Sequence, residues 1–192
     1  MGDARASDCN RLGGHFGFSG NQQRYHTLMH SIALWFTAPM LVLMFTTAGA
    51  ATFGGRVVGV HDGDTITVLD SNRQQHKIRL AGIDAPEARQ AYGSRSKQSL
   101  SNWVYNREVT VDWSKRDRYG RLVGVVSADG HDVNLEQIRA GMAWWYRQYA
   151  KEQTANDRKL YEDAENTARG AKQGLWADAN PVPPWGWRKQ RR

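Results

Sequence analysis

Five short segments in which polar and apolar residues alternate constrain most strongly what this chain can fold into. Turn-forming clusters of Asp, Gly, Ser and Asn, or charged loops, lie between them, as is typical of strands joined by turns. The segments are residues 56–60, 65–69, 75–80, 108–113 and 122–126. Strands this short expose unpaired edges in an open sheet, whereas closure into a barrel removes the edges. The pattern therefore predicts a five-stranded β-barrel.

A helical period replaces the strand period in three places. We predict helices over about 88–106, from Asn134 to about Ala143, and over about 157–172. Gln137 follows Asn134 by three residues, which resembles a capping box at the start of the second helix. The residues expected on one side of the third helix are Leu160, Ala164 and Ala168. The sequence thus predicts an α+β fold, mainly β: an OB-fold-type barrel with about three helices.

The chain has 192 residues, enough for one domain with its own core. We predict a targeting segment, a folded domain and a tail, at residues 1–50, 51–176 and 177–192. Proline is frequent at 181–187, which predicts an extended strap that leaves 188–192 as a free basic end. The one cysteine, Cys9, precedes the domain. Redox chemistry and cysteine–zinc sites are therefore excluded within the domain.

The N-terminal segment has the features of a secretory signal peptide. Residues 32–46 are apolar and uncharged, three arginines precede them, and Ala48-Gly49-Ala50 follows as a cleavage-site pattern. We therefore expect a secreted or periplasmic protein. If cleavage does not occur, residues 32–51 are just long enough to anchor the protein in a membrane, and a buried helix is the third alternative.

The chain is basic, with a formal net charge of +7 and a pI of about 9.8. The first 50 residues carry only three Lys/Arg and two Asp/Glu, so the basic character belongs to the domain. A positive surface favours polyanions such as nucleic acids by raising their local concentration. The charge is equally consistent with a solvated basic surface that has no partner. The choice between these two interpretations therefore depends on the sequence motifs.

Three segments carry the candidate chemistry, namely HDGDT at 61–65, IRLAGIDAPE at 78–87 and DRYGR at 117–121. Each alone is a common turn or helix start. Their order and spacing, together with the Gly-Leu-Trp ending at 174–176, resemble the thermonuclease (staphylococcal nuclease-like, SNase) family over about residues 57–176. The chain also looks similar to the nucleases encoded at plasmid partition loci.

Two aspartates are candidate ligands of a hard cation, because Ca²⁺ takes carboxylate, carbonyl and water oxygens. Asp64 stands at the head of one predicted strand and Asp84 follows another. The resemblance implies that the residue after the second aspartate adds its backbone carbonyl, which here is Ala85. The alternative is that both aspartates only stabilise turns. Their occurrence in the same motifs as Glu87 and two arginines argues against this alternative.

Glu87 and two arginines complete the expected catalytic set. The resemblance implies that Glu87 positions or deprotonates the attacking water, and Pro86 is expected to place it in the first turn of the next helix. Arg79 alternates with Ile78 and Leu80, so it is expected on the opposite face of its strand. Guanidinium groups bind phosphate oxygens bidentately. The resemblance assigns Arg79 and Arg121 to the phosphate, with Arg121 also near the leaving oxygen.

Aromatic residues are the candidates for contacts with the nucleotide. Tyr119 matches a family position that packs against the nucleotide, and Tyr149 lies in an aromatic cluster beside basic residues. Trp144 and Trp145 of the same cluster are expected to pack in the core. His61 is expected on the surface, because Ca²⁺ does not favour imidazole.

These features predict a Ca²⁺-dependent endonuclease that hydrolyses DNA and also RNA by in-line attack of water. By resemblance, 3′-phosphate ends are expected. Residues 88–93 are shorter and poorer in lysine than the corresponding family loop, which bears on substrate grip and on the choice between DNA and RNA. Two alternatives stay open. One is a barrel that binds single-stranded nucleic acid without cutting it, and the other is a membrane-tethered interaction domain.

Overall fold

The structure is a computed structural model that describes residues 51–191. The predicted signal or anchor at 32–46 and Cys9 lie outside the described residues, so these predictions stay predictions. Among residues 51–191, none of the helices has the length and apolar character needed to cross a membrane.

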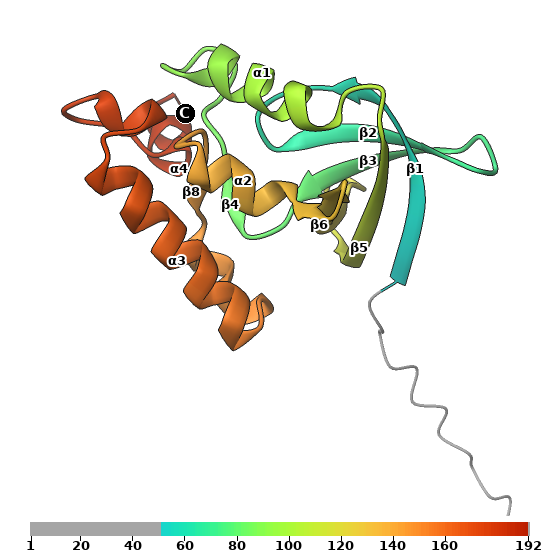
Figure 1. The fold of residues 1–192 in the computed structure, drawn as a ribbon. Coiled ribbons are helices and arrows are strands. Elements are labelled where there is room, and N and C mark those ends of the chain that lie inside the picture. Colours follow the sequence, from blue (N-terminus) through green and yellow to red (C-terminus); the bar gives the residue numbers. More distant parts are fainter. Residues whose placement is uncertain (1–50, 192) are drawn as a thin grey trace, which may run out of the picture. The chain divides into compact units, whose positions relative to one another are not determined.

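A closed sheet forms the centre of the described chain (Figure 1). Its strands are β1 (Ala51–Val60), β2 (Thr65–Asp70), β3 (Gln75–Leu80), β5 (Glu108–Arg116) and β6 (Leu122–Ala128). Antiparallel pairing gives the order β3-β2-β1-β5-β6, and a parallel pairing of β3 with β6 closes the ring. The predicted five-stranded barrel is confirmed, with β1 and β5 longer than predicted.

Three shorter strands lie outside the five-strand ring. They are β4 (Ile83–Asp84), β7 (His131–Asp132) and β8 (Trp144–Trp145). β7 extends the sheet beside β6, whereas β4 pairs only with β8 in a two-stranded ribbon. This ribbon matters for the site because it fixes Asp84 opposite Trp144.

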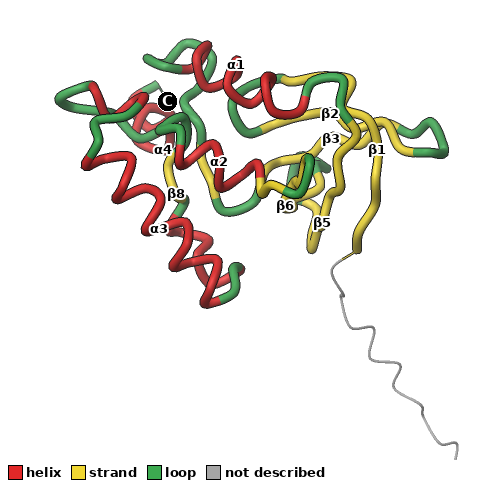
Figure 2. Tube along the Cα trace, viewed as in Figure 1, coloured by secondary structure: helices red, strands yellow, loops and turns green. Residues whose placement is uncertain are grey.

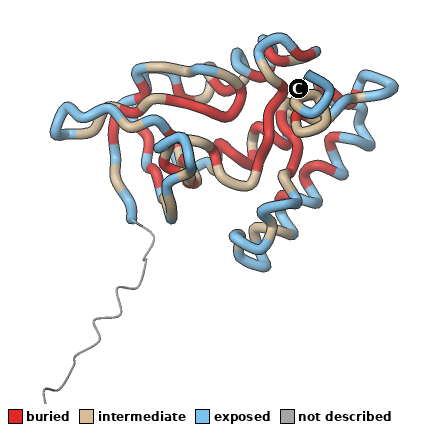
Figure 3. Tube along the Cα trace, turned by 180° about the vertical axis from the view of Figure 1, so that it is seen from behind, coloured by how far each residue is buried: buried red, intermediate tan, exposed pale blue. Residues whose placement is uncertain are grey.

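Buried residues line the inside of the barrel and the elements packed against it (Figure 3), and most of them are apolar. The fully buried members from the strands are Val57, Ile66, Val68, Ile78, Val111 and Val126. They recur at every second position, as the alternation in the sequence requires. Arg79 is only partly buried between buried Ile78 and Leu80, which confirms that it leaves the core side of β3.

The described chain has four α-helices and two 3-10 helices (Figure 2). They are α1 (Gly93–Val104), α2 (Val133–Arg139), η1 (Arg147–Glu152), α3 (Ala155–Gly170), η2 (Gly174–Ala177) and α4 (Pro184–Gln190). Helices α1 and α2 pack against the barrel, and α3 packs against α2 and β8. The prediction that the first helix begins near residue 88 is wrong, because α1 begins at Gly93. In α3 the buried residues include Tyr161 and Glu165, whereas Leu160 is exposed.

The predicted capping box of the second helix is also wrong. Asp132 is the N-cap of α2, and its carboxylate accepts a hydrogen bond from the Leu135 amide. Asn134 and Gln137 are fully buried instead, where a polar side chain needs hydrogen-bond partners. α2 is also shorter than predicted, since it ends at Arg139.

The proline-rich tail is not the extended strap that its composition predicts. Pro183 is the N-cap and Pro184 the first residue of α4, a position that suits the fixed φ of proline and its missing N–H. Trp185 stacks on Tyr146 with ring centroids 5.3 Å apart and packs edge-on against Trp144. Arg188 is therefore part of a docked helix and not of a free basic end.

The two buried amides of α2 hold the loops that carry the motif aspartates. Gln137 Nε2 donates to the carbonyls of Gly63 (2.8 Å) and Ser96 (3.1 Å). Asn134 Nδ2 donates to the carbonyls of Ala81 (2.9 Å) and Gly124 (3.2 Å). Gly63 precedes Asp64 and Ala81 precedes β4, so one helix fixes both aspartate-bearing segments.

We predict that Gln137→Leu destabilises the protein by about 1–3 kcal/mol, because it leaves the Gly63 and Ser96 carbonyls buried without this donor. Urea unfolding followed by circular dichroism measures the loss. Arg139→Gln, on the exposed side of the same helix, is the control and should change the free energy of unfolding by less than about 1 kcal/mol. Equal stability of Gln137→Leu and the wild type would contradict the proposed holding role.

Candidate active site

The turn at residues 61–64 sets the position of Asp64. The Asp62 carboxylate accepts a hydrogen bond from the Asp64 amide (3.0 Å), and the His61 amide donates to the Thr65 carbonyl (2.9 Å). Gly63 packs directly against α1, where an added Cβ would lie 1.8 Å from Ser96 Oγ. Only glycine allows this approach, so the HDGD pattern reflects close packing as well as turn chemistry.

Asp64 is 6% exposed, and both of its carboxylate oxygens have partners. Thr65 Oγ1 donates to Oδ1 (3.0 Å), and the Ala85 amide donates to Oδ2 (2.7 Å). The second contact joins the head of β2 to the residue that follows β4. Ala85, the predicted carbonyl ligand, is therefore adjacent to the carboxylate that it was predicted to assist.

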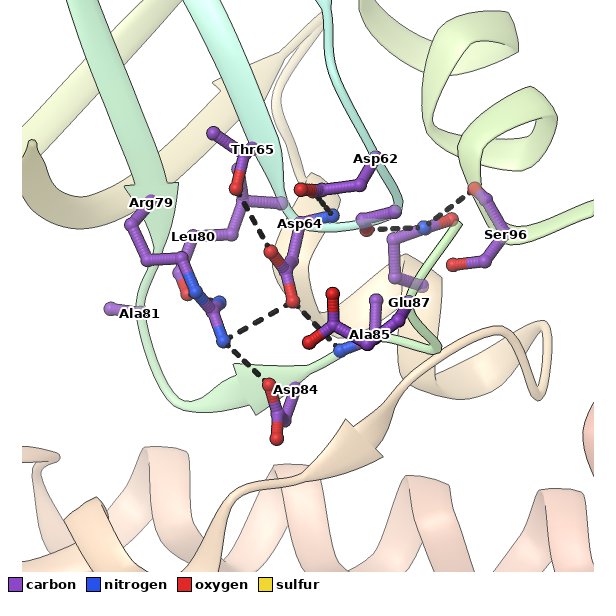
Figure 4. Close-up of polar contacts among 12 residues, drawn as sticks. Asp62, Asp64, Thr65, Arg79, Leu80, Ala81, Asp84, Ala85, Glu87 and Ser96 are labelled. Atoms are coloured by element: carbon purple, nitrogen blue, oxygen red, sulfur yellow. Dashed lines mark hydrogen bonds and ion pairs between the residues drawn. The ribbon is translucent and has the colours of Figure 1, made fainter. Parts of the chain in front are cut away.

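Arg79 lies between the two aspartates (Figure 4). Its Nη2 is 3.2 Å from Asp64 Oδ2 and 2.9 Å from Asp84 Oδ1, and its Nη1 donates to the Leu80 carbonyl at 2.8 Å. The side chain of Asp84 is only 1% exposed. The structure thus joins Asp64 and Asp84 through Arg79, a residue that the sequence resemblance assigns to the phosphate.

Burial raises the pKa of both aspartates. Desolvation brings the pKa of Asp64 to about 6, although Arg79 opposes the shift. Desolvation also raises the pKa of Asp84, against the hydrogen bonds from Arg188 and the charge of Arg79. Two carboxylates held so close together and away from water favour the approach of a positive charge.

Glu87 lies in a loop and not in the first turn of a helix, which corrects the sequence-based placement. Its amide donates to Gln90 Oε1 (3.1 Å), its carbonyl accepts from the Gln90 amide (2.8 Å), and α1 begins only at Gly93. Its side chain is 40% exposed. Figure 4 shows the carboxylate on the side of the loop that faces Asp64.

One guanidinium from the far end of the chain contacts both Asp84 and Glu87. Arg188 Nη1 is 2.8 Å from Glu87 Oε1 and 3.2 Å from Asp84 Oδ1, and Arg188 Nη2 is 2.8 Å from Asp84 Oδ2. The two carboxylates therefore flank the same space. Arg188 was not predicted as a site residue, because nothing in a basic tail distinguishes one arginine from the next.

Arg121 is placed near this group but is engaged elsewhere. In the parallel register Ile78 pairs with Leu122 and Arg79 with Val123, so Arg121 lies one residue before the strand beside β3. Its Nε and Nη2 each contact Asp117 Oδ2 at 2.7 Å. Within residues 51–191 its recorded ion pair is with Asp117 and not with the three site carboxylates.

The surroundings of the Asp117 carboxylate favour its ionised form and therefore its ion pair with Arg121. Burial alone would raise the pKa of Asp117, but hydrogen bonds from Arg121 and from backbone amides outweigh burial and lower the pKa. The Tyr119 ring, 68% exposed, lies 5.4 Å from the Arg121 guanidinium carbon. Tyr119 therefore offers an open aromatic face beside a cation.

The aromatic cluster divides into buried and exposed members. Trp144 and Trp145 are 7% and 6% exposed, which confirms that they pack in the interior. Tyr149 is 40% exposed and contacts Lys115 and the Tyr146 ring. Tyr146 lies beside the segment that carries Asp84, because its amide donates to the Gly82 carbonyl (2.8 Å). Burial, and after it the charge of Asp84, raise the pKa of Tyr146.

The donor set around the aspartates suits a hard cation. Within the described range 51–191, no group of three or more His, Cys, Asp and Glu side chains is arranged to hold a metal ion. The carboxylates of Asp64 and Asp84 are both buried and both contact Arg79, so they form a smaller set of oxygen donors. Oxygen donors completed by water match the preference of Ca²⁺, and His61 is occupied with Thr67 at 2.8 Å.

Comparison with known proteins agrees with this geometry. Residues 77–178 match the family model described as staphylococcal nuclease homologue. A protein of Escherichia coli O157:H7 described as an uncharacterized endonuclease is 46% identical over 155 residues, which cover 80% of this chain and 97% of that protein. A micrococcal nuclease of Shigella flexneri is 43% identical over 166 residues, or 82% and 92% of the two chains.

A third relative bears on the resemblance to plasmid-encoded nucleases. Protein ParB of Escherichia coli is 40% identical over 162 residues, which cover 80% of this chain and 89% of that protein. Its name fits the similarity to nucleases of partition loci that the sequence motifs indicate.

We predict that the metal-free protein loses stability as the pH rises through about 6, the raised pKa of Asp64. A carboxyl whose pKa is higher in the folded than in the unfolded state stabilises the fold when protonated, below about pH 4, and this contribution disappears above the folded pKa. The loss is up to roughly 3 kcal/mol between pH 4 and pH 8.

Denaturant unfolding in chelator at several pH values measures this slope. Asp64→Asn should flatten it, whereas Asp163→Asn, an exposed position on α3, should leave it unchanged. The same slope in Asp64→Asn and in the wild type would show that another group is responsible.

Proposed function

The chain belongs to the staphylococcal nuclease family and is a nuclease, and from this premise we propose that it uses Ca²⁺ to hydrolyse phosphodiester bonds of both DNA and RNA. The observation that supports the proposal best is one connected cluster of charges, in which Arg79 contacts Asp64 and Asp84 and Arg188 contacts Asp84 and Glu87. Such a cluster has the charges that cleavage of a phosphodiester requires, namely a cation site, an acid–base group and guanidinium groups.

We assign the metal site to Asp64, Asp84 and the carbonyl of Ala85. When bound there, Ca²⁺ would supply positive charge to the phosphoryl oxygens and orient the scissile phosphate. The protein's own contribution is rigidity, because Asp64 is fixed by the Ala85 amide and by Arg79. The loops on both sides are fixed in turn by the amides of α2.

Glu87 is the proposed general base. Its carboxylate is the most exposed of the three and is therefore open to a water molecule, unlike Asp64 and Asp84. It takes a proton from the attacking water as the water approaches phosphorus in line with the departing oxygen. Proton transfer of this kind contributes about 10²–10⁴ to the rate.

The two motif arginines are proposed to bind the phosphate. Arg79 is already oriented by Asp64, Asp84 and the Leu80 carbonyl, and we assign its remaining N–H groups to the phosphate. Arg121 is proposed to stabilise the charge on the phosphate and on the leaving oxygen. For this its guanidinium must either leave Asp117 or contact Asp117 and the phosphate at the same time. By family analogy the products carry 3′-phosphates. Tyr119 and Tyr149, both exposed, are the proposed contacts for the nucleotide.

We predict that cleavage of single- and double-stranded DNA requires Ca²⁺ and stops with chelator. The reason is that Asp64 and Asp84 offer oxygen donors, which Ca²⁺ can complete with further oxygens and water, whereas Mg²⁺ requires near-ideal octahedral geometry and gives up its waters reluctantly. A gel assay with Ca²⁺, Mg²⁺ or chelator measures this, with RNA as a parallel substrate. Cleavage that is indifferent to chelator would refute the metal assignment, and salt-sensitive binding without cleavage under any metal would indicate a binding module instead.

We predict that Glu87→Gln lowers kcat by about 10²–10⁴ and Arg121→Ala by about 10³–10⁵. Both side chains are at least partly exposed, so the melting temperature should change little. Glu108→Gln and Arg107→Ala are matched controls on the exposed side of the barrel and should keep nearly full activity. A fully active Glu87→Gln or Arg121→Ala would remove that residue from the mechanism.

A further inference from the structure

The C-terminal helix places a cation on two of the site carboxylates. Arg188 in α4 contacts both oxygens of Asp84 at 2.8 Å and 3.2 Å and one oxygen of Glu87 at 2.8 Å. This is the two-pronged geometry that guanidinium adopts with carboxylates. The residues are separated by more than 100 positions in the chain, so the contact depends on how α4 docks.

Several contacts besides Arg188 hold α4 in this place. Trp185 stacks on Tyr146 with an interplanar angle of 8° and meets the edge of Trp144. Pro184 is buried, and the Val182 carbonyl accepts a hydrogen bond from Gln90 Nε2 (2.6 Å) in the loop after Glu87. The docking of the tail is therefore built from specific aromatic and polar contacts.

Charge shows why this contact conflicts with a bound metal ion. Asp64, Asp84 and Glu87 carry three negative charges, and Arg79 and Arg188 carry two positive charges, so one net negative charge remains. Without Arg188 the net charge is two negative, which balances a divalent cation. A guanidinium on Asp84 would also repel a metal ion on the same carboxylate.

We propose that α4 is an autoinhibitory latch, in which the Arg188 guanidinium occupies the position of the cation on Asp84 and Glu87 and must leave before a divalent ion binds. This inference rests on the metal assignment proposed above. It adds that in the metal-free enzyme the Arg188 guanidinium competes with the metal ion for its site.

The contacts of Arg188 allow the latch to open. The side chain of Arg188 is 40% exposed, and that of Glu87 equally so, which means that water screens part of their attraction. α4 has only seven residues. When Arg188 leaves, Glu87 loses its recorded ion-pair partner and becomes free to accept a proton.

The test compares Ca²⁺ binding in Arg188→Ala and in Lys189→Ala by isothermal titration calorimetry, without nucleic acid. Lys189 is exposed in the same helix, so its removal changes the net charge equally. We expect Arg188→Ala to bind Ca²⁺ about tenfold more tightly than the wild type, and Lys189→Ala to stay within about twofold. Circular dichroism establishes that each variant is folded.

A second measurement uses the wild-type protein alone. Hydrogen exchange of the backbone amides of residues 185–191 should become faster when Ca²⁺ is added, while the barrel strands keep their protection. This result would support release of the latch even if Arg188→Ala did not fold.

The outcomes separate this inference from the metal assignment. If Ca²⁺ binds the wild type and Arg188→Ala equally well and α4 keeps or gains protection, the latch is overturned and the metal site stands. If neither protein binds Ca²⁺, the metal assignment falls and the latch falls with it. Binding by Arg188→Ala with none by the wild type would be the strongest support for the latch.

Discussion

The site depends on one arginine placed between two buried carboxylates. Two carboxylates cannot both stay ionised in a dry pocket unless a positive charge compensates them, because desolvation and mutual repulsion favour protonation. Arg79 provides this charge through contacts with Asp64 and Asp84. It sits on the outer side of β3, while Ile78 and Leu80 on the inner side fix the strand in the core. The pocket is therefore anchored by the same strand that closes the barrel against β6.

Rigidity reaches the pocket from the helical side as well. The α2 helix buries Asn134 and Gln137, and their amides bind the loops before β2 and before β4. Because buried polar groups are costly when unpaired, these hydrogen bonds tolerate little displacement of either loop. The aspartates are thus held between a barrel strand and a helix, which limits the rearrangement that ligand binding requires.

The proposed C-terminal latch would make the activity of this pocket depend on the free metal-ion concentration. A site that holds an internal cation needs a higher concentration of metal ion before it is occupied. Calcium-binding sites of extracellular proteins work at far higher free Ca²⁺ than cytosolic ones. The latch would therefore keep the nuclease silent where free Ca²⁺ is low and allow activity outside the cell. This links the latch to the predicted export signal at 32–46, which remains a prediction from the sequence.

The sequence by itself determined the barrel strands and the residues of the motif. Strand alternation is a local property, and the turns around Asp64 and Arg121 use side chains within four positions. Tertiary structure decided what local patterns cannot encode. The spacing of Asn134 and Gln137 predicted a capping box, but in the fold both side chains are buried and donate hydrogen bonds to the carbonyls of Ala81 and Gly63. Arg188 looked like one cation of a basic tail, yet docking of α4 set it on Asp84, 104 positions away. Such contacts depend on which surfaces the folded chain brings together, and no spacing along the chain records that.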